Sequence, residues 1–271
     1  MTPPGWCLTV HVALGASNGL GGRCRISGVT SHIRAVFFDL YDTLIGFDPP
    51  REVIQGRAMG TQGLTSDKDG IDAGYAMADS LMAEQTAQAP LSALTAEAQS
   101  DFFARYEQLI LRGAGHDVDL QTAGDVWRAV RRQEYGFALY PDVTPALDSL
   151  RADGYVIGVI TNMSRPGEDV AETMGFRDSV DFTLSSMDVG ASKPDPQMFR
   201  AALSRAGVDP IQAVHVGDQL ETDIDGARAA GLNPVLIDRH SAATDYDDCP
   251  RITTLEEFPA VLKALRISPG E

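Results

Sequence analysis

The chain has 271 residues, of which 44% are hydrophobic and 22% charged, and its formal net charge is -16 at pH 7. This length allows one sizeable core, alone or with a smaller appended unit. The negative charge argues against nucleic acid and anionic surfaces as partners, and no apolar run is long enough to span a bilayer, which argues against a role within a membrane.

The N-terminal stretch, residues 1–32, contains many glycines and a short apolar run with no basic residue ahead of it. These features predict a poorly ordered extension rather than a secretory signal. The three cysteines, Cys7, Cys24 and Cys249, form no C-x-x-C pair and suit a reducing compartment. We therefore expect a cytoplasmic protein.

From Ile33 onward, short apolar runs alternate with amphipathic segments, a pattern typical of parallel β-α-β units. Five strands are predicted, with the sequences AVFFD (35–39), YVIGVIT (155–161), DFTLSS (181–186), AVHVGD (213–218) and PVLID (234–238). Several are apolar at consecutive positions, as expected when helices cover both faces of a sheet. His215, inside the fourth of these strands, is expected to be a core residue with a satisfied side chain.

The boundaries of several helices are marked by specific residues. Thr144 and Pro145 predict the N-cap and first turn of one helix. Glycines predict the ends of this helix and of later ones, at Gly154, Gly175, Gly207 and Gly231. The pattern indicates an α/β fold with a Rossmann-like, three-layer α/β/α core and a parallel sheet, built from residues 33–46 and 140–271.

Residues 47–139 break the alternation because they contain helical stripes of apolar residues and no strong strand. The stripes are Ile71, Tyr75, Ala78 and Met82, then Phe102, Tyr106, Leu109, Ile110 and Gly113, then Val126, Trp127 and Val130. They predict an all-helical insertion in which three or more helices pack as a small bundle. The aromatic residues of the insertion are expected to form its core.

Polar side chains follow the predicted strands at the points where the strands end. In an open parallel sheet, ligands bind outside these carboxyl ends. The residues are Asp39, Tyr41, Asp42 and Thr43 after the first strand, Thr161 and Asn162 after the second, Ser192 and Lys193 in SKPDP, and Asp218, Glu221 and Asp223 in HVGDQLETD. We expect these groups to meet at one site.

In order along the chain, FFDLYDTL, VITN, SKPDPQMF and HVGDQLETDIDGARAAGL resemble the four motifs of the haloacid dehalogenase-like (HAD) hydrolase superfamily. The resemblance runs from Ile33 to about Leu265, and the G-D-x-x-x-x-D spacing of the fourth motif is its most specific feature. The helical insertion after the first motif, residues 47–139, is similar to the C1-type cap domain of subfamily I. The resemblance implies a hydrolase whose cap closes over the site.

Asp39 is the expected nucleophile, because a carboxylate at a strand tip can attack phosphorus or an activated carbon and form a covalent intermediate. Asp218 and Asp223 supply hard oxygen ligands that, together with Asp39, can hold Mg²⁺. Asp223 has an alternative role as the N-cap of the helix that begins in DIDGARAA.

Lys193 offers a cation where charge develops on the transferred group, and so it can attract an anionic small-molecule substrate. Thr161 and Asn162 are expected to bind phosphate oxygens through a hydroxyl and a backbone N–H, although Thr161 can equally make a strand-end hydrogen bond. Thr43 is expected to orient the nucleophile.

Tyr41 stands where phosphatases of the family usually carry an aspartate that protonates the leaving alkoxide. The loss of such acid-base help costs roughly 10²- to 10⁴-fold in rate. The resemblance still implies that the backbone carbonyl of Tyr41 ligates Mg²⁺ and that its side chain contacts the substrate. The adjacent Asp42 is one residue out of phase, which disfavours it as a substitute acid.

These residues leave three hypotheses for the function of the chain. The first is a Mg²⁺-dependent phosphatase that acts on a small phosphorylated metabolite through an aspartyl-phosphate. The second is an L-2-haloacid dehalogenase, whose branch resembles this chain at Tyr41 but lacks the acids of GDQLETD. The third is a weakly active descendant that serves as a binding protein. The intact acids favour the first, because three clustered carboxylates repel one another without a cation. The sequence leaves the substrate and the oligomeric state open.

Overall fold

The computed structural model describes residues 32–89, 91–241 and 245–267. The extension expected over residues 1–32 therefore lies outside the described residues, except for His32. Within the described part of the chain, no helix is both long and apolar enough to cross a bilayer.

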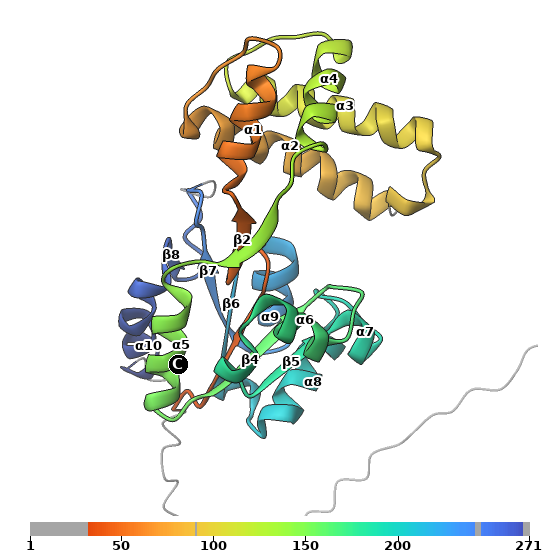
Figure 1. Ribbon diagram of the computed structural model, residues 1–271. Helices are drawn as coiled ribbons and strands as arrows, with labels where there is room; N and C mark the ends of the chain where they lie inside the picture. The colour runs from red at the N-terminus through yellow and green to blue at the C-terminus, as the bar shows by residue number, and fades with distance from the viewer. Residues whose placement is uncertain (1–31, 90, 242–244, 268–271) are drawn as a thin grey trace, which may run out of the picture. The chain divides into compact units, whose positions relative to one another are not determined.

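A six-stranded parallel sheet forms the centre of the fold (Figure 1). Its strands, in spatial order, are β5 (Phe182–Ser185), β4 (Val156–Thr161), β1 (Ala35–Phe38), β6 (Ala213–Gly217), β7 (Asn233–Ile237) and β8 (Arg251–Ile252). The five predicted strands are confirmed. The sixth, β8, was not predicted, because a two-residue strand has no periodicity to detect.

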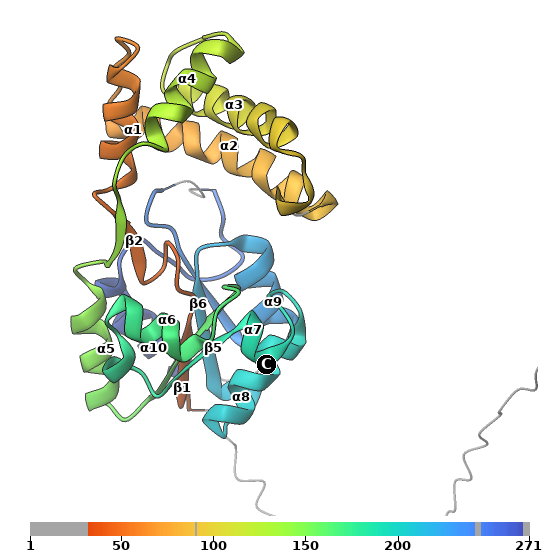
Figure 2. The ribbon, with the colours of Figure 1, turned by 45° about the vertical axis from the view of Figure 1, so that its right-hand side comes forward.

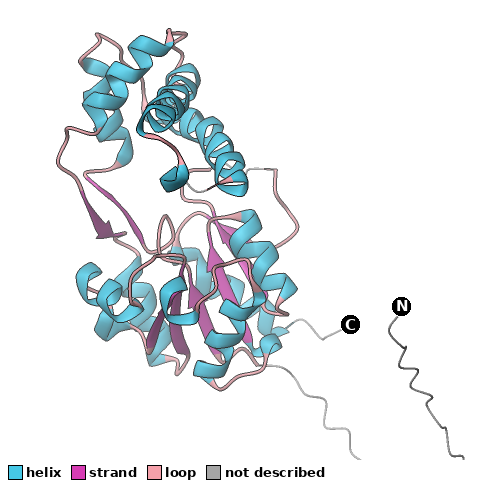
Figure 3. Cartoon of the chain, turned by 90° about the vertical axis from the view of Figure 1, so that its right-hand side faces the viewer, coloured by secondary structure: helices cyan, strands magenta, loops and turns pink. Residues whose placement is uncertain are grey.

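Helices cover both faces of this sheet, as Figure 3 shows by colour. They are α5 (Val143–Ala152), α6 (Gly167–Met174), α7 (Ser186–Val189), α8 (Pro196–Ala206), α9 (Gly226–Ala229) and α10 (Phe258–Ile267). Single-turn 3-10 segments lie at Leu91–Ala93, Arg177–Ser179, Pro210–Gln212 and Leu255–Glu257. The predicted three-layer α/β/α architecture is confirmed.

The two phenylalanines of β1 explain the three layers. Successive side chains of a strand point to opposite faces, so Phe37 and Phe38 enter different halves of the core. Phe38 packs in the cluster that includes residues of α5, α6 and α10, whereas Phe37 packs in the cluster that includes residues of α8 and α9. Both rings are fully buried, and burial of such a side chain contributes about 1.5–3 kcal/mol.

Most of the predicted helix boundaries agree with the structure, with one correction. Gly175 and Gly207 end α6 and α8 in the left-handed conformation, with φ of 77° and 64°. The helix predicted to begin with Thr144 as N-cap instead has Asp142 at that position and begins at Val143. Pro145 then lies in the first turn, where a missing N–H is tolerated.

In the described part of the insertion after β1, four α-helices lie together beyond the ribbon β2–β3 (Figure 2). They are α1 (Arg51–Gly60), α2 (Lys68–Gln88), α3 (Ala96–Gly113) and α4 (Leu120–Val130). The three predicted apolar stripes fall on α2, α3 and α4. The side chains of Asp67, Thr95 and Asp119 cap the N-termini of these three helices by accepting backbone N–H bonds.

The insertion is not entirely helical. A two-stranded antiparallel ribbon, β2 (Ile45–Asp48) and β3 (Gly136–Leu139), connects the helices to the core. Phe47 pairs with Phe137 across the ribbon, and their rings stack at 5.3 Å. The sequence pattern missed both strands because each is only four residues long and β3 is largely exposed.

Glu107 of α3 is a buried acid within the helical insertion. It has no exposed surface, and it accepts a hydrogen bond from the side chain of Gln55 on α1. Its Oε2 atom has no hydrogen-bond partner among the described residues. Burial raises the pKa of Glu107 from 4.5 to about 7, so in the folded state this carboxyl is mostly protonated only below that pH.

We expect this acid to make folding pH-dependent. Below the pKa of the unfolded chain, Glu107 is neutral in both states. As the pH rises from about 4.5 through 7, the unfolded chain loses the proton first, and stability falls by about 3 kcal/mol. Urea unfolding at pH 5 and pH 8 should show a smaller loss in Glu107→Gln, which cannot ionise. Equal losses in the two proteins would contradict the assignment.

Candidate active site

The candidate site lies at the carboxyl ends of β4, β1 and β6. The chain passes from β1 to β4 and β5 on one side and then to β6, β7 and β8 on the other, so β1 lies at the topological switch point. Asp39 directly follows β1, and its backbone N–H donates to Val216 of β6 at 2.9 Å. Thr161 ends β4 and Asp218 follows β6. Parallel sheets of this kind bind ligands at such a crevice.

Lys193 connects two of the predicted acids. Its Nζ atom lies 2.5 Å from Oδ1 of Asp39 and 2.6 Å from Oδ1 of Asp223. The lysine is 4% exposed. Burial alone would lower the pKa of Lys193, but the two carboxylates outweigh it and raise the pKa, so the amine remains charged.

Asn162 fixes the segment that carries this lysine. The backbone N–H of Lys193 donates to Oδ1 of Asn162 at 2.7 Å, and Nδ2 of Asn162 donates to the Lys193 carbonyl at 3.0 Å. The side chain of Asn162 thus positions Lys193. Its backbone N–H, the group predicted to contact phosphate, is not part of this pair of bonds.

Asp223 is buried within the π-helical turn η4 (Leu220–Asp225). Its Oδ1 lies 2.9 Å from Nε2 of His215, and its Oδ2 accepts the N–H of Gln219 at 3.1 Å. The alternative role of Asp223 as the N-cap of the following helix is wrong, because α9 begins only at Gly226. His215 is a core residue, as expected, and its Nε2 is bonded to Asp223, but its buried Nδ1 has no hydrogen-bond partner among the described residues, so the side chain is only partly satisfied.

Gly217 makes the close approach of Asp223 possible. A Cβ atom at position 217 would lie 2.3 Å from Cγ of Asp223. Burial would raise the pKa of Asp223, but Lys193 and His215 outweigh it and lower the pKa below its ordinary value. Asp223 is therefore an ionised, tightly held carboxylate.

The three acids fit a divalent cation. Asp39, Asp218 and Asp223 each offer a carboxylate oxygen, and these atoms lie within 4.8 Å of one another. Oδ1 of Asp218 is buried and meets no hydrogen-bond donor in the described part of the chain. Burial, together with the charges of Asp39 and Asp223, raises the pKa of Asp218 well above its ordinary value. When all three carboxylates are ionised, one lysine leaves an excess of negative charge, which a cation such as Mg²⁺ would offset.

Asp39, the expected nucleophile, is itself deeply buried. Asp39 is 8% exposed, and burial raises its pKa from 3.8 to about 6, while Lys193 opposes the rise. Asp39 is thus mostly ionised at neutral pH and above. A desolvated, ionised carboxylate beside a fixed cation is suited to nucleophilic attack on an electrophilic centre.

The ring of Tyr41 packs against the ribbon β2–β3. Its ring contacts Phe47 and Phe137 edge to face, with centroid distances of 5.7 and 5.8 Å. Burial and the neighbouring charge of Asp42 raise the pKa of the Tyr41 phenol. The phenol therefore keeps its proton. The family resemblance predicts a general acid at residue 41, and this chain has instead an aromatic ring that packs on the ribbon.

Thr161, at the end of β4, and Thr43, in the loop between β1 and β2, are both buried. Oγ1 of Thr43 finds no hydrogen-bond partner within the described residues. The Thr43 carbonyl accepts two bonds from Arg239, at 3.0 Å from Nε and 2.7 Å from Nη2. The predicted roles of these hydroxyls, to orient Asp39 and to bind phosphate, stay predictions.

Sequence reasoning missed the support that Arg239 gives to this loop. Nη1 of Arg239 lies 3.0 Å from Asp142, and its guanidinium stacks 4.0 Å above the ring of Tyr140. Arg239 and Thr43 are 196 positions apart, and no periodicity or spacing in the sequence connects them. In the sequence, an arginine after β7 does not by itself indicate that it supports a distant loop.

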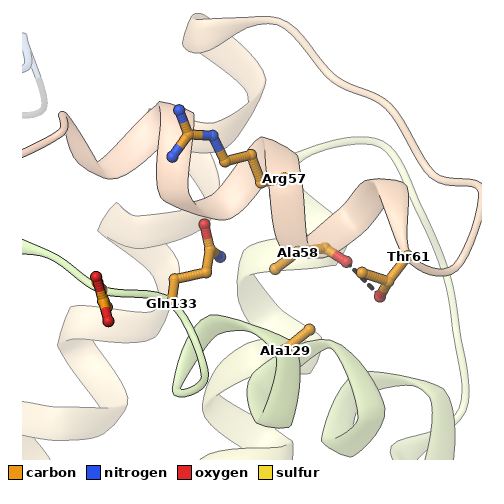
Figure 4. Close-up of a pocket in the computed structure, with 6 residues that line it drawn as sticks. Arg57, Ala58, Thr61, Ala129 and Gln133 are labelled. Atoms are coloured by element: carbon orange, nitrogen blue, oxygen red, sulfur yellow. Dashed lines mark hydrogen bonds between the residues drawn. The ribbon is translucent and has the colours of Figure 1, made fainter.

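A separate hollow on the helical insertion is not part of the site. It lies between α1 and α4 and is lined by Arg57, Ala58, Thr61, Ala129, Gln133 and Glu134 (Figure 4). Thr61 donates to the carbonyl of Ala58 there at 2.7 Å. None of the strand-end residues lines this hollow.

The fold and the site together define a class of protein: an α/β protein with three carboxylates and a buried lysine gathered at the switch point of a parallel sheet. The family profile described as haloacid dehalogenase-like hydrolase matches residues 33–231. This match covers more than half of the chain. The chain belongs to the haloacid dehalogenase-like hydrolase family, as its four motifs predicted, and it is an enzyme of that family.

Relatives and solved structures agree with this assignment. The chain is 42% identical over 91 residues to haloacid dehalogenase-like hydrolase domain-containing protein 3 of Mus musculus. The aligned segment covers 34% of this chain and only 36% of that protein. It is 30% identical over 214 residues to glyceraldehyde 3-phosphate phosphatase of Methanopyrus kandleri, covering 76% and 84% of the two chains. A HAD hydrolase of Bacillus subtilis, solved bound to magnesium, has the same fold at 18% identity, with a TM-score of 0.53 over 85% of this chain and 99% of that one.

Proposed function

We propose that this enzyme is a Mg²⁺-dependent phosphatase that hydrolyses a small phosphorylated metabolite through an aspartyl-phosphate on Asp39. The observation that carries the proposal is the cluster of Asp39, Asp218 and Asp223 around one buried lysine. The name of the Methanopyrus kandleri relative, a glyceraldehyde 3-phosphate phosphatase, supports a small phosphate ester as the substrate class. Helices α1–α4 would act as the cap over the site.

Each residue has a defined part in the reaction. A carboxylate oxygen of Asp39 forms a bond to phosphorus while the bond from phosphorus to the ester oxygen breaks, and the alkoxide leaves with the electron pair. Lys193 holds Oδ1 of Asp39 and offsets charge on the transferred group. Bound Mg²⁺ would neutralise the repulsion between the nucleophile and the phosphate.

The second half of the reaction regenerates the enzyme. Water attacks the phosphorus of the aspartyl-phosphate, the bond between phosphorus and Asp39 breaks, and inorganic phosphate leaves. Tyr41 is not available to protonate the departing alkoxide, because its ring packs against Phe47 and Phe137 of the ribbon. The departing alkoxide must take a proton from water, which favours substrates with good leaving groups.

Removal of the metal tests this function directly. The full chain should hydrolyse p-nitrophenyl phosphate in the presence of Mg²⁺, lose at least about tenfold of that rate in EDTA, and regain it when Mg²⁺ is restored. Asp39→Asn, which has the same shape and no nucleophilic charge, should be inactive under all three conditions. Absent or chelator-insensitive turnover would contradict the proposal, and chelator-insensitive halide release from a 2-haloacid would establish the dehalogenase alternative.

A further inference from the structure

The loop that carries the nucleophile, residues 39–45, is a tight turn. The backbone N–H groups of Leu44 and Ile45 both donate to the carbonyl of Leu40, at 2.8 and 2.9 Å, and the N–H of Asp42 donates to Ile45 at 2.8 Å. Asp42 has a φ of 53°, a left-handed conformation that is uncommon outside glycine. The carboxylate of Asp42 accepts the hydroxyl of Tyr140 at 3.0 Å.

Arg51 of α1 joins this loop to the cap helices. Its Nη1 lies 4.0 Å from Oδ2 of Asp42, and its Nη2 lies 3.2 Å from Oδ1 of Asp72 on α2. Its guanidinium also stacks 4.7 Å above the ring of Tyr75, one turn further along α2. The Arg51 and Asp42 side chains are only 11% and 17% exposed. One arginine therefore bridges two cap helices and the nucleophile loop.

His240, which follows β7 in the core, lies beside the same two acids. Its Nε2 is 3.5 Å from Asp42, and its Nδ1 is 3.8 Å from Asp72. Asp42 and Asp72 thus lie between an arginine of the cap and a histidine of the core. The ion pair between Arg51 and Asp42 therefore lies at the junction between the cap and the nucleophile loop.

We infer that Arg51 is a positioning residue, which sets the nucleophile loop through Asp42 when the cap is in place. A largely buried ion pair tolerates few geometries, and removal of one partner leaves the other charge uncompensated. Asp42 is three residues from Asp39 and next to Tyr41, whose carbonyl is a predicted metal ligand. A shift of Asp42 therefore moves the reacting carboxylate, and an error of about 1 Å in such a group can cost roughly 100-fold in rate.

A double-mutant cycle tests this inference and, for its kinetic readout, rests on the proposed phosphatase function. Arg51→Ala and Asp42→Asn should each lower kcat for p-nitrophenyl phosphate by roughly 10- to 100-fold, with a smaller change in KM. The double variant should lose less than the product of the two single losses, because the Arg51–Asp42 contact is common to both changes even though Arg51 also contacts Asp72. Arg57→Ala, exposed on the same helix, should match the wild type. Multiplicative losses, or an unaffected Arg51→Ala, would overturn the inference.

Hydrogen exchange gives a second readout that needs no activity. In Arg51→Ala and in Asp42→Asn, the amides of Leu44 and Ile45 should exchange faster than in Arg57→Ala, while the amides of α3 and α4 keep their protection and show a folded cap. If the wild-type enzyme hydrolysed no phosphate ester, the proposed function would fail while this test would still apply. Unchanged exchange at Leu44 and Ile45 would refute the positioning role.

Discussion

Replacement of Tyr41 by aspartate should raise the rate of alkyl phosphate hydrolysis by roughly 10²- to 10⁴-fold, the usual contribution of general acid-base help. The proposed reaction lacks a proton donor for the departing alkoxide. Burial raises the pKa of the Tyr41 phenol, and the ring packs against Phe47 and Phe137 instead of taking part in proton transfer. A carboxyl group two residues after Asp39 would supply the missing proton and then activate the attacking water.

The leaving group and two matched variants make this prediction specific. With p-nitrophenyl phosphate the gain should be small, because p-nitrophenolate leaves without a proton. Tyr41→Asn, which has the shape of aspartate but no acid, should show no gain, and Tyr41→Phe should behave like the wild type. Equal rates for the Asp and Asn variants on an alkyl phosphate would argue that the site lacks more than an acid, as expected of a binding descendant.

The Asp variant also loses aromatic packing. Edge-to-face pairs contribute about 0.5–1.5 kcal/mol each beyond the area they bury, and Tyr41 makes two of them. Urea unfolding of all three variants should therefore accompany the kinetics, because Tyr41→Asp and Tyr41→Asn should lose similar stability. A rate difference between two equally destabilised proteins then reports on proton transfer alone.

The parallel core could be predicted because its sequence signals are local. Runs such as AVFF in β1 are apolar at every position, which fits a strand buried on both faces. Asp39 and Asp218 directly follow such runs, so the direction of the strands alone brings them to one edge of the sheet. The contacts of Lys193 with Asp39 and Asp223 agree with that expectation.

The contacts that hold the site in place could not be predicted in the same way. Arg239 reaches Thr43 across 196 positions, and Arg51 reaches Asp42 from helix α1 of the insertion. Such pairs depend on three-dimensional placement and have no periodicity in the chain. The packing of Tyr41 was hidden for the same reason, since its partners Phe47 and Phe137 are 90 positions apart and belong to strands too short to recognise.

Replacement of Lys193 by methionine should destabilise the fold and nearly abolish activity. Nζ of Lys193 lies 2.5 Å from Asp39 and 2.6 Å from Asp223, and the side chain is almost fully buried. Removal of one partner from a buried ion pair costs about 3–5 kcal/mol, because the remaining charge is left uncompensated. The loss of a cation that faces developing charge should lower kcat by a further factor of roughly 10² to 10³.

Mg²⁺ should return part of the lost stability but little of the lost rate. In Lys193→Met, the acids Asp39, Asp218 and Asp223 have no lysine between them, so a bound cation is their remaining source of positive charge. Urea unfolding should therefore show a larger stabilisation by Mg²⁺ in this variant than in the wild type. Lys263→Met, an exposed lysine on α10, provides the control and should change neither stability nor its response to Mg²⁺. If Lys193→Met were as stable as Lys263→Met, the Lys193 amine would not be what holds these carboxylates together. Another group would then have to balance the negative charge of the three acids.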